Sequence, residues 1–548
     1  MAAAVCAILT IPIAWNSREL ISSDGLSYLE VGANTARYGF GYLFANAYWS
    51  QLYPAILAVV LKLAHPSLAS ELIVVRCVDW VICTGTYFSF TWFLLNFLRW
   101  IHLARGPVIQ NRRHLLVVLA FAYTLLFVCN LDVTLWLAGP HILVEGMVFL
   151  AAGACLRLSL PGAGLRHYAL FGAILALGFV AKTALFPLSL LLLIFLAIRA
   201  VAQRSGGRET AVAAVVFLLG SLPVVAALSY NKGRLTIGDA GKLTYAFYVS
   251  GVPRYWEVRQ PDTPLPHAPR QILKVPEIVK FDSPFPATYS YWYDPSYWYE
   301  GVNPPFDLRL QMRQFLRIFG VAPKFMLSGL TVFQLAARWP SLWMGLAAFT
   351  VFGLRAGKIY RYIGPAQSWL FLWPICGFLT FASVLIEYRY LVPFLVLGWT
   401  TLFVVAWGLI DSRKWIGATV VVTMGLVLAY GPDYARQLKK IPQAPSSLSN
   451  AAVARKLESL GIRAGDQLAG VGFADYAYYA RLVGARFTIQ IMAGDRDAMA
   501  KLPASDVAQI LETLRSNGAR ALYSPYTPAF DNDSGWVKVS SNGYVRML

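Results

Sequence analysis

The first 430 residues of the chain alternate between long apolar segments and short polar connections. Such segments approach the roughly 20 apolar residues that a helix needs to cross a bilayer. The pattern predicts a polytopic α-helical membrane domain over residues 1–435, with about eleven transmembrane helices, give or take two. The expected spans are residues 1–17, 71–98, 115–131, 139–156, 168–181, 183–199, 211–229, 333–354, 367–387, 391–410 and 415–433.

One apolar segment, residues 53–64, does not fit this scheme. It offers only about a dozen apolar residues, which is too short for a crossing. Counting it as a span would also place the basic loop at 99–113 on the opposite side from the other basic loops. We therefore expect a juxtamembrane or re-entrant helix at this position.

Two longer polar regions interrupt the apolar pattern. Residues 18–50 form the first loop, and residues 230–332 form a long loop rich in Pro, Trp and Tyr. The many prolines of the second loop exclude long helices, so we expect an ordered, aromatic-lined segment with short helices. Its end, 306–321, interleaves aromatic and apolar residues with arginines, which favours a helix lying in the membrane interface.

The tail at 446–548 differs from the rest of the chain, because short apolar runs there alternate with amphipathic segments. This alternation predicts a small soluble α/β domain. The expected helices are 451–460, 475–482 and 505–517, and the expected strands are 467–472, 486–492, 519–523, 536–539 and 544–548.

Composition and charge agree with a membrane protein. Hydrophobic residues make up 57% of the chain and charged residues 14%, whereas soluble proteins carry about 25% charged residues. The 47 basic and 28 acidic residues leave a net charge of +19, much of it in the loops at 99–113, 199–208, 355–361 and 413–414. This is the positive-inside pattern of a cytoplasmic face. The lipid bilayer is therefore the expected partner, and no nucleic acid is.

Asp24 is the first candidate for chemistry. It lies in a polar stretch directly after the first apolar segment, and the aromatic run 48–54 follows. A carboxylate beside aromatics at a membrane face suits an enzyme whose substrate is partly lipid and partly polar. The alternatives are an N-cap for a helix starting near Leu26 and aromatics that only mark the interface. Trp49 and Tyr53 of the run are candidates for lining a substrate site.

Two cations fall at the same predicted face as Asp24. Lys182 interrupts an apolar run, and a charge at that depth is costly enough to indicate function; the alternative is a lysine that extends its amine to the interface. Arg389 breaks the positive-inside pattern, and its planar guanidinium suits a phosphate. The alternative for Arg389 is an ion pair with Glu387. Tyr390, next to Arg389, is a further candidate for lining a substrate site.

A third group lies near the predicted fourth span. His141 and Glu145 are four residues apart and share one helix face, close in sequence to Asp132. Such a set can bind a divalent metal, and a polar cluster between helices is the alternative. The sequence leaves metal dependence open and indicates no other cofactor.

Three motifs in register resemble those of a known superfamily: Asp24 with the run 48–54, the hairpin 181–187 and the hairpin 388–393. Over residues 15–430 they resemble the membrane-integral GT-C glycosyltransferases. The bacterial protein-mannosyltransferase and lipid A aminoarabinose-transferase group is the most similar within it.

The resemblance implies a GT-C-like fold and a location in the bacterial inner (plasma) membrane. The basic loops and the order of the spans place the first loop, the long loop and the C-terminal domain on the extracytoplasmic side. It also implies an inverting transfer of a sugar from a polyprenyl-phosphate donor to an envelope lipid, glycan or protein. Asp24 then matches the catalytic carboxylate of the first loop, and Lys182 and Arg389 match positions that bind the donor phosphate.

The chain departs from the family pattern in three places. Gly25 follows Asp24 where many relatives have an Asp-Glu pair, residues 51–54 replace a Lys-Pro-Pro motif, and Pro140-His141 replaces Pro-Asp. A transporter or flippase, with the same charges as gating groups, is the alternative function. Transporters often place such charges near the bilayer midplane within an internal repeat, and the sequence contains no evident repeat.

Overall fold

A computed structural model describes most of the chain. The described residues are 1–106, 111–131, 138–254, 265–318, 364, 367–409, 412–440, 450–472, 474, 477–492, 499–525, 527–530, 534–541 and 543–548. The predicted span at 333–354 and Asp132 lie outside them.

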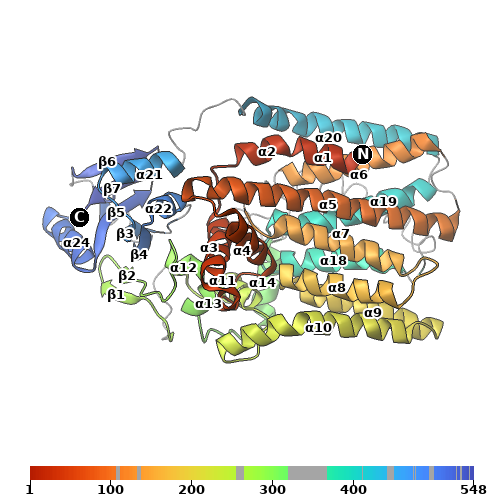
Figure 1. Cartoon of the computed structure of the whole chain (residues 1–548), viewed down its shortest axis with the longest axis horizontal. Coiled ribbons are helices and arrows are strands. Elements are labelled where there is room, and N and C mark those ends of the chain that lie inside the picture. The colour runs from red at the N-terminus through yellow and green to blue at the C-terminus, as the bar shows by residue number, and fades with distance from the viewer. Residues whose placement is uncertain are drawn as a thin grey trace.

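Long helices packed side by side form one part of the molecule, and a mixed sheet lies beyond one end of them (Figure 1). Most of the expected spans in the described residues correspond to single helices. These are α5 (Leu68–Arg105), α6 (Arg112–Leu131), α7 (His141–Arg157), α8 (Leu165–Ala181), α9 (Leu185–Gln203), α10 (Gly207–Lys232), α18 (Trp369–Ala382), α19 (Tyr388–Leu409) and α20 (Ser412–Lys440).

The first expected span is divided into two short helices. α1 (Ala2–Leu9) and α2 (Ile11–Asn16) meet at Thr10, and Pro12 lies in the first turn of α2. Proline has no N–H to donate to the preceding turn, so it is tolerated at the start of a helix and not in its interior. By length and apolar composition, five helices of the described chain can cross a membrane: α6, α9, α10, and most of α19 and α20. The predicted count of about eleven is not confirmed.

Three elements of the N-terminal region lie at the end of the helical part that faces the sheet. α3 (Ser23–Tyr38), the 3₁₀ helix η1 (Phe40–Phe44) and α4 (Leu52–Ala64) connect α2 to α5, and α3 and α4 run across the ends of the long helices (Figure 1). A Cβ added at Gly32 of α3 would lie 2.9 Å from Leu57 Cβ of α4, so glycine permits their close packing. α4 is the helix predicted at 53–64, and its 13 residues are too few to span a bilayer.

The long loop before the second half of the chain contains the expected short helices. They are α11 (Ala240–Tyr248), α12 (Ser290–Tyr293), α13 (Pro295–Trp298) and α14 (Leu308–Ile318). α14 is the amphipathic helix predicted within 306–321. Its Gln311 and Gln314 donate to the carbonyl oxygens of Ser383 and Val384, at 2.7 and 2.8 Å, beyond the end of α18.

The sheet has seven strands in the order β1-β2-β4-β3-β5-β7-β6. β3 pairs in parallel with β4 and β5, and the other neighbours are antiparallel. The tail contributes α21 (Asn450–Ser459), α22 (Tyr478–Val483), α24 (Ala504–Ser516), β3 (Gln467–Val471), β4 (Arg486–Ile491), β5 (Ala519–Pro525), β6 (Trp536–Ser540) and β7 (Gly543–Met547). The predicted succession of α/β elements is confirmed.

Two strands of this sheet come from outside the tail. β1 (Arg270–Leu273) and β2 (Ile278–Lys280) belong to the long loop, and β2 pairs with the edge of β4, placing Ile278 opposite Ile491. Only short helices were expected there from the proline-rich sequence. Prolines exclude long helices but leave room for a strand as short as β1, which lies between Pro269 and Pro276.

Ion pairs connect the sheet to the helices. Arg481 of α22 donates two hydrogen bonds to Glu71 of α5, at 2.9 and 2.7 Å, and another to Glu30 of α3 at 3.3 Å. All three side chains are largely buried. Two carboxylates around one guanidinium therefore hold the sheet, α3 and α5 together.

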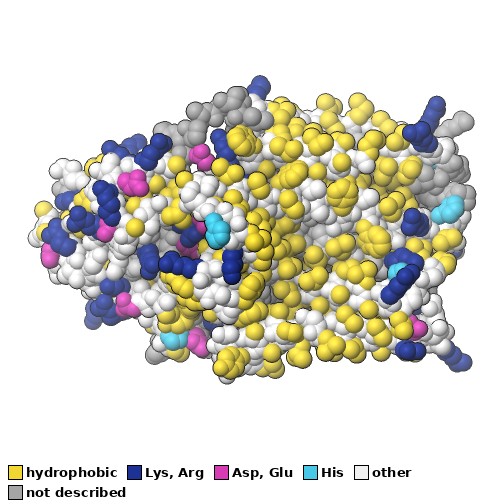
Figure 2. Space-filling model, viewed as in Figure 1, with side chains coloured by type: hydrophobic (Ala, Val, Ile, Leu, Met, Phe, Trp, Pro, Cys, Tyr) yellow, Lys and Arg dark blue, Asp and Glu magenta, His cyan; other side chains and the backbone are white. Residues whose placement is uncertain are grey.

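Hydrophobic side chains cover the visible face of the long helices, and Lys and Arg lie at both ends of the molecule, over the sheet and at the end opposite it (Figure 2). α5 ends there at Arg105 and α10 begins there at Gly207 (Figure 1). The described residues of the predicted basic loops at 99–113 and 199–208 thus share one end of the molecule, where a single membrane face would place them.

Candidate active site

A cavity of about 530 Å³ lies at the end of the long helices nearest the sheet. Its walls come from the start of α3, the loop before α4, the α8–α9 turn, α11, α12 and the α18–α19 turn. Five predicted site residues line it: Asp24, Trp49, Lys182, Arg389 and Tyr390. The fold therefore brings together charges that are far apart in sequence.

Asp24 lies in the first turn of α3 and is not the residue that caps this helix. The N-cap is Ser22, whose side-chain oxygen accepts a hydrogen bond from the backbone N–H of Gly25 at 3.0 Å. An acidic side chain in a first turn interacts favourably with the helix dipole. The capping role is filled by Ser22, so the carboxylate of Asp24 remains available to the cavity.

The two carboxylate oxygens of Asp24 have different partners. The indole N–H of Trp292 donates to Oδ1 at 3.0 Å, and the guanidinium of Arg389 donates to Oδ2 at 2.8 Å. The Asp24 and Arg389 side chains remain 21% and 19% exposed, respectively. The carboxylate is therefore oriented from two sides and still accessible from the cavity.

Arg389 is the second residue of α19 and also lies near Glu387, with 3.6 Å between Nε and Oε2. The ion pair considered from sequence is thus present, and Asp24 provides a second, closer carboxylate. Burial raises the pKa of Glu387 above its ordinary value, and the nearby Asp24 carboxylate raises it further, while Arg389 and Lys182 oppose the increase.

Lys182 follows the last residue of α8 in extended backbone conformation. Its Nζ donates to the hydroxyl of Tyr390 at 3.2 Å and lies 4.5 Å from the centre of the Tyr390 ring. Tyr390 stacks in turn on Phe381 of α18. Among the ion pairs of the described residues none involves Lys182, so its charge is held by an aromatic phenol instead of a carboxylate.

Aromatic rings form one wall of the cavity. The ring centres of Tyr48 and Trp49 each lie 5.8 Å from that of Trp292, and Trp49 donates its indole N–H to the carbonyl oxygen of Tyr293 at 2.9 Å. Burial raises the pKa of the Tyr48 phenol. Planar rings at this position can stack on a sugar face.

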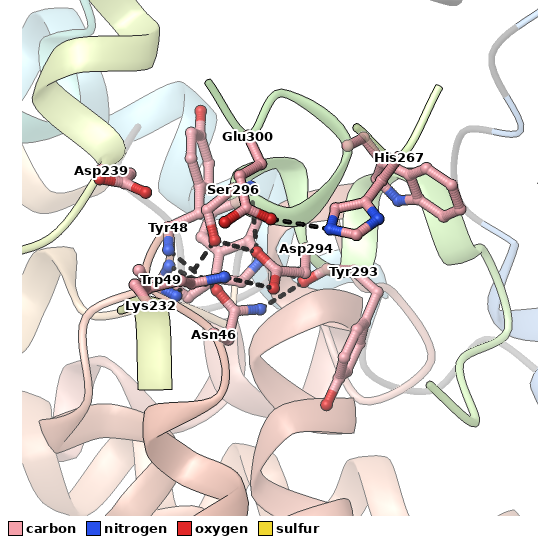
Figure 3. A network of polar contacts seen from close by, with 12 residues as sticks. Asn46, Tyr48, Trp49, Lys232, Asp239, His267, Tyr293, Asp294, Ser296 and Glu300 are labelled. Carbon is pink, nitrogen blue, oxygen red and sulfur yellow. Dashed lines mark hydrogen bonds and ion pairs between the residues drawn. The ribbon is translucent and has the colours of Figure 1, made fainter. Parts of the chain in front are cut away.

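A network of polar contacts lies behind this wall (Figure 3). Asn46 donates to the carbonyl oxygen of Tyr293 at 2.6 Å, and Lys232 lies 3.5 Å from the buried carboxylate of Asp294. Ser296 accepts from the backbone N–H of Ala47 at 3.2 Å. These contacts fix residues 293–296 against the loop before α4 and the end of α10, and so they hold Trp292 and Trp49 in place.

Three predicted site residues lie elsewhere. Tyr53 is fully buried and donates to Asp79 at 2.6 Å, and it does not line the cavity. His141 and Glu145 are buried on α7 and are not among the residues that line the cavity, and Glu145 accepts from Asn130 at 3.3 Å. Within the described part of the chain, which excludes Asp132, no cluster of three His, Cys, Asp or Glu side chains could hold a metal ion.

Sequence reasoning missed several residues of the cavity. Trp292 belongs to the aromatic run 292–299, which marked the long loop without singling out one ring, and Tyr48 belongs to the run 48–54. Lys242 of α11 has no motif around it that points to a site; burial lowers its pKa, which the carboxylate of Asp239 partly restores. Only the folded arrangement identifies these three positions.

The whole chain resembles solved glycosyltransferase structures. ArnT from Cupriavidus metallidurans in the apo state aligns with a TM-score of 0.53 at 12% identity, covering 99% of this chain and 97% of that one. The same protein bound to undecaprenyl phosphate aligns equally well, with a TM-score of 0.53 at 12% identity and coverages of 99% and 96%. The archaeal oligosaccharyltransferase AglB from Archaeoglobus fulgidus, in complex with an inhibitory peptide and a dolichol-phosphate, aligns with a TM-score of 0.51 at 11% identity over 96% of this chain and 69% of that one.

No protein-family model matches the sequence, and no curated protein sequence matches it significantly. The similarity to ArnT and AglB is therefore one of fold. It agrees with the GT-C resemblance of the sequence motifs, which does not depend on the structure.

Proposed function

We propose that this protein is an inverting glycosyltransferase. It moves a sugar from a polyprenyl-phosphate donor to an envelope lipid, glycan or protein at the extracytoplasmic face of the bacterial inner membrane. The observation that carries the proposal is the shared cavity, where a carboxylate, Asp24, lies beside two cations, Lys182 and Arg389. The ArnT and AglB structures that share the fold contain undecaprenyl phosphate and dolichol-phosphate, respectively.

Each charge has a role in such a transfer. Asp24 accepts the proton of the acceptor hydroxyl as its oxygen attacks the anomeric carbon, and a positioned base of this kind contributes roughly 10²–10⁴-fold. The bond from the anomeric carbon to the phosphate oxygen breaks, and polyprenyl phosphate leaves with the electron pair. Lys182 and Arg389 stabilise the charge that develops on that phosphate.

Lys182 is the better prepared of the two cations for an incoming phosphate. Its partner is the Tyr390 hydroxyl, at 3.2 Å, so its charge is not already matched by a carboxylate among the described residues. Arg389 is paired with Asp24, so a phosphate that approaches it competes with Oδ2 of Asp24. Donor binding thereby frees the oxygen that acts as base.

The test compares envelope glycans by mass spectrometry in cells that lack the protein, that contain it, and that contain Asp24→Asn. The proposal expects one sugar modification that is present only with the parent protein. Unchanged glycans in all three strains would refute it. A transporter or flippase would instead move a lipid-linked sugar across the membrane without forming a new glycosidic bond, and Asp24→Asn would then leave the bond-forming step unaffected.

A further inference from the structure

Trp292 is the only side chain besides Arg389 that the described contacts place in hydrogen-bond distance of the Asp24 carboxylate. The two donors approach different oxygens. Trp292, in the long loop, donates its indole N–H to Oδ1 at 3.0 Å. Arg389, next to the α18–α19 turn, donates to Oδ2 at 2.8 Å. The two contacts differ in kind, because a neutral indole does not attract a phosphate and a guanidinium does.

The position of Trp292 is itself fixed at several points. Ser27 of α3, one helical turn after Asp24, donates its hydroxyl to the carbonyl oxygen of Trp292 at 2.9 Å. The next carbonyl, that of Tyr293, accepts from Asn46 at 2.6 Å and from the Trp49 indole at 2.9 Å (Figure 3). Three other side chains therefore fix the backbone at residues 292 and 293, and this backbone directs the indole N–H of Trp292 toward Asp24.

We propose that Trp292 is a positioning residue that fixes Oδ1 of Asp24 and so assigns Oδ2 as the oxygen that accepts the proton of the acceptor hydroxyl. This inference rests on the proposed function and identifies a further residue of the same site. When a donor phosphate draws Arg389 away, the hydrogen bond to Trp292 remains. The carboxylate then keeps its orientation and does not rotate about χ2, a torsion that is broad in aspartate when nothing restrains it.

This assignment determines which bonds break and form in the transfer and where the proton goes. The acceptor O–H bond breaks and its proton passes to Oδ2, while the acceptor oxygen forms the new bond to the anomeric carbon. The bond to the phosphate oxygen breaks and polyprenyl phosphate leaves with that electron pair. Oδ1, still hydrogen-bonded to Trp292, takes no proton.

The chain provides a matched control for the test. Trp298, in the same loop, is buried and donates its indole N–H at 3.0 Å, but to the carbonyl oxygen of Ser290, and it does not line the cavity. Trp292→Phe and Trp298→Phe therefore remove the same donor and keep an aromatic ring. Only the first removes a contact to Asp24.

The experiment adds each purified variant to membranes from cells that lack the protein and follows the sugar-modified product by mass spectrometry. We expect Trp292→Phe to lower the transfer rate, measured at a saturating concentration of membranes, about 10- to 100-fold. This is the usual effect of losing a hydrogen bond to a charged group. Its affinity for undecaprenyl phosphate in nanodiscs should equal that of the parent. Trp298→Phe should keep the parental rate and melt at a lower temperature.

A double-mutant cycle separates positioning from a general structural role. If Trp292 acts through Asp24, Trp292→Phe should have less than about a threefold effect in the Asp24→Asn background, because coupled residues are not additive. A parental rate for Trp292→Phe, or the same fold loss in both backgrounds, overturns the positioning role while the proposed function stands. A parental rate for Asp24→Asn removes the proposed base itself.

Discussion

The guanidinium of Arg389 donates to Oδ2 of Asp24 at 2.8 Å, across 365 residues of sequence. The carboxylate proposed as the base and one of the cations proposed to bind the donor phosphate thus neutralise each other before any substrate is present. Binding of the donor must break this contact or share it. The arrangement therefore favours an order in which the lipid-linked donor binds first and the acceptor is activated second.

Lys182 should govern affinity for the lipid phosphate. Lys182→Ala removes a cation that has no carboxylate partner among the described residues, and a charge-assisted hydrogen bond of this kind is worth about 10- to 100-fold in Kd. Binding of undecaprenyl phosphate to the protein in nanodiscs measures the loss. Lys62→Ala, at an exposed position in the last turn of α4, is the control and should bind as the parent does. Equal affinities for the two variants would remove the role of Lys182.

Glu387 should make stability depend on pH. Burial raises its pKa above 4.5 in the folded protein, so between 4.5 and the raised value the folded state binds more protons than the unfolded chain. Stability contributed by this group is then highest at low pH and is lost as the pH rises through that window. Thermal unfolding of the parent and of Glu387→Gln from pH 4.5 to 7 tests this. The Tm of the parent should fall relative to that of the variant as the pH rises, and a constant difference would contradict the assignment.

Opposite ends of the molecule should face opposite sides of the membrane. Ser205 lies in the α9–α10 connection at the basic end, and Lys501 precedes α24 in the sheet domain. In intact cells a membrane-impermeant thiol reagent should label Lys501→Cys and spare Ser205→Cys, measured against the labelling of the parent, which has six cysteines of its own. Labelling of Ser205→Cys alone would reverse the proposed orientation and move the cavity to the cytoplasmic side.

Local sequence patterns predicted which helices and strands form better than they predicted which of these elements pair with one another. Apolar segments gave the long helices, and alternating short runs gave β3 to β7, because both depend on residues close in sequence. β1 and β2 were missed because strands of three or four residues in a proline-rich loop are stable only through pairing, β2 with β4 and β1 with β2. No local signal encodes that pairing.

The same distinction applies to the site. Lys182 was identified because it interrupts an apolar run, Arg389 because it breaks the positive-inside pattern, and Asp24 because its polar stretch adjoins an aromatic run. Tyr53 resembled Trp49 in sequence, but α4 turns it toward Asp79 and away from the cavity. Trp292 was one of many aromatic residues in its loop, and only its contact with Asp24 distinguishes it.

A change at Ser22 tests how the start of α3 contributes to stability, separately from the chemistry of the Asp24 carboxylate. Ser22→Ala removes the side chain that caps the helix, which should destabilise the protein by about 1 kcal/mol. Asp24 keeps its contacts with Trp292 and Arg389 in this variant, so transfer per folded molecule should stay near the parental rate. A lowered Tm with unchanged specific activity checks this, and a large loss of transfer would make the helix start as important as the carboxylate.

The most direct test of the account is the transfer rate of Asp24→Asn. Asparagine keeps the size of the side chain and the hydrogen bond from Trp292, but it cannot accept the proton of the acceptor hydroxyl and does not pair ionically with Arg389. We predict that transfer falls by roughly 10² or more, while undecaprenyl phosphate binds at least as tightly as to the parent because Arg389 is released. Transfer at a near-parental rate by a folded Asp24→Asn protein would contradict the central claim.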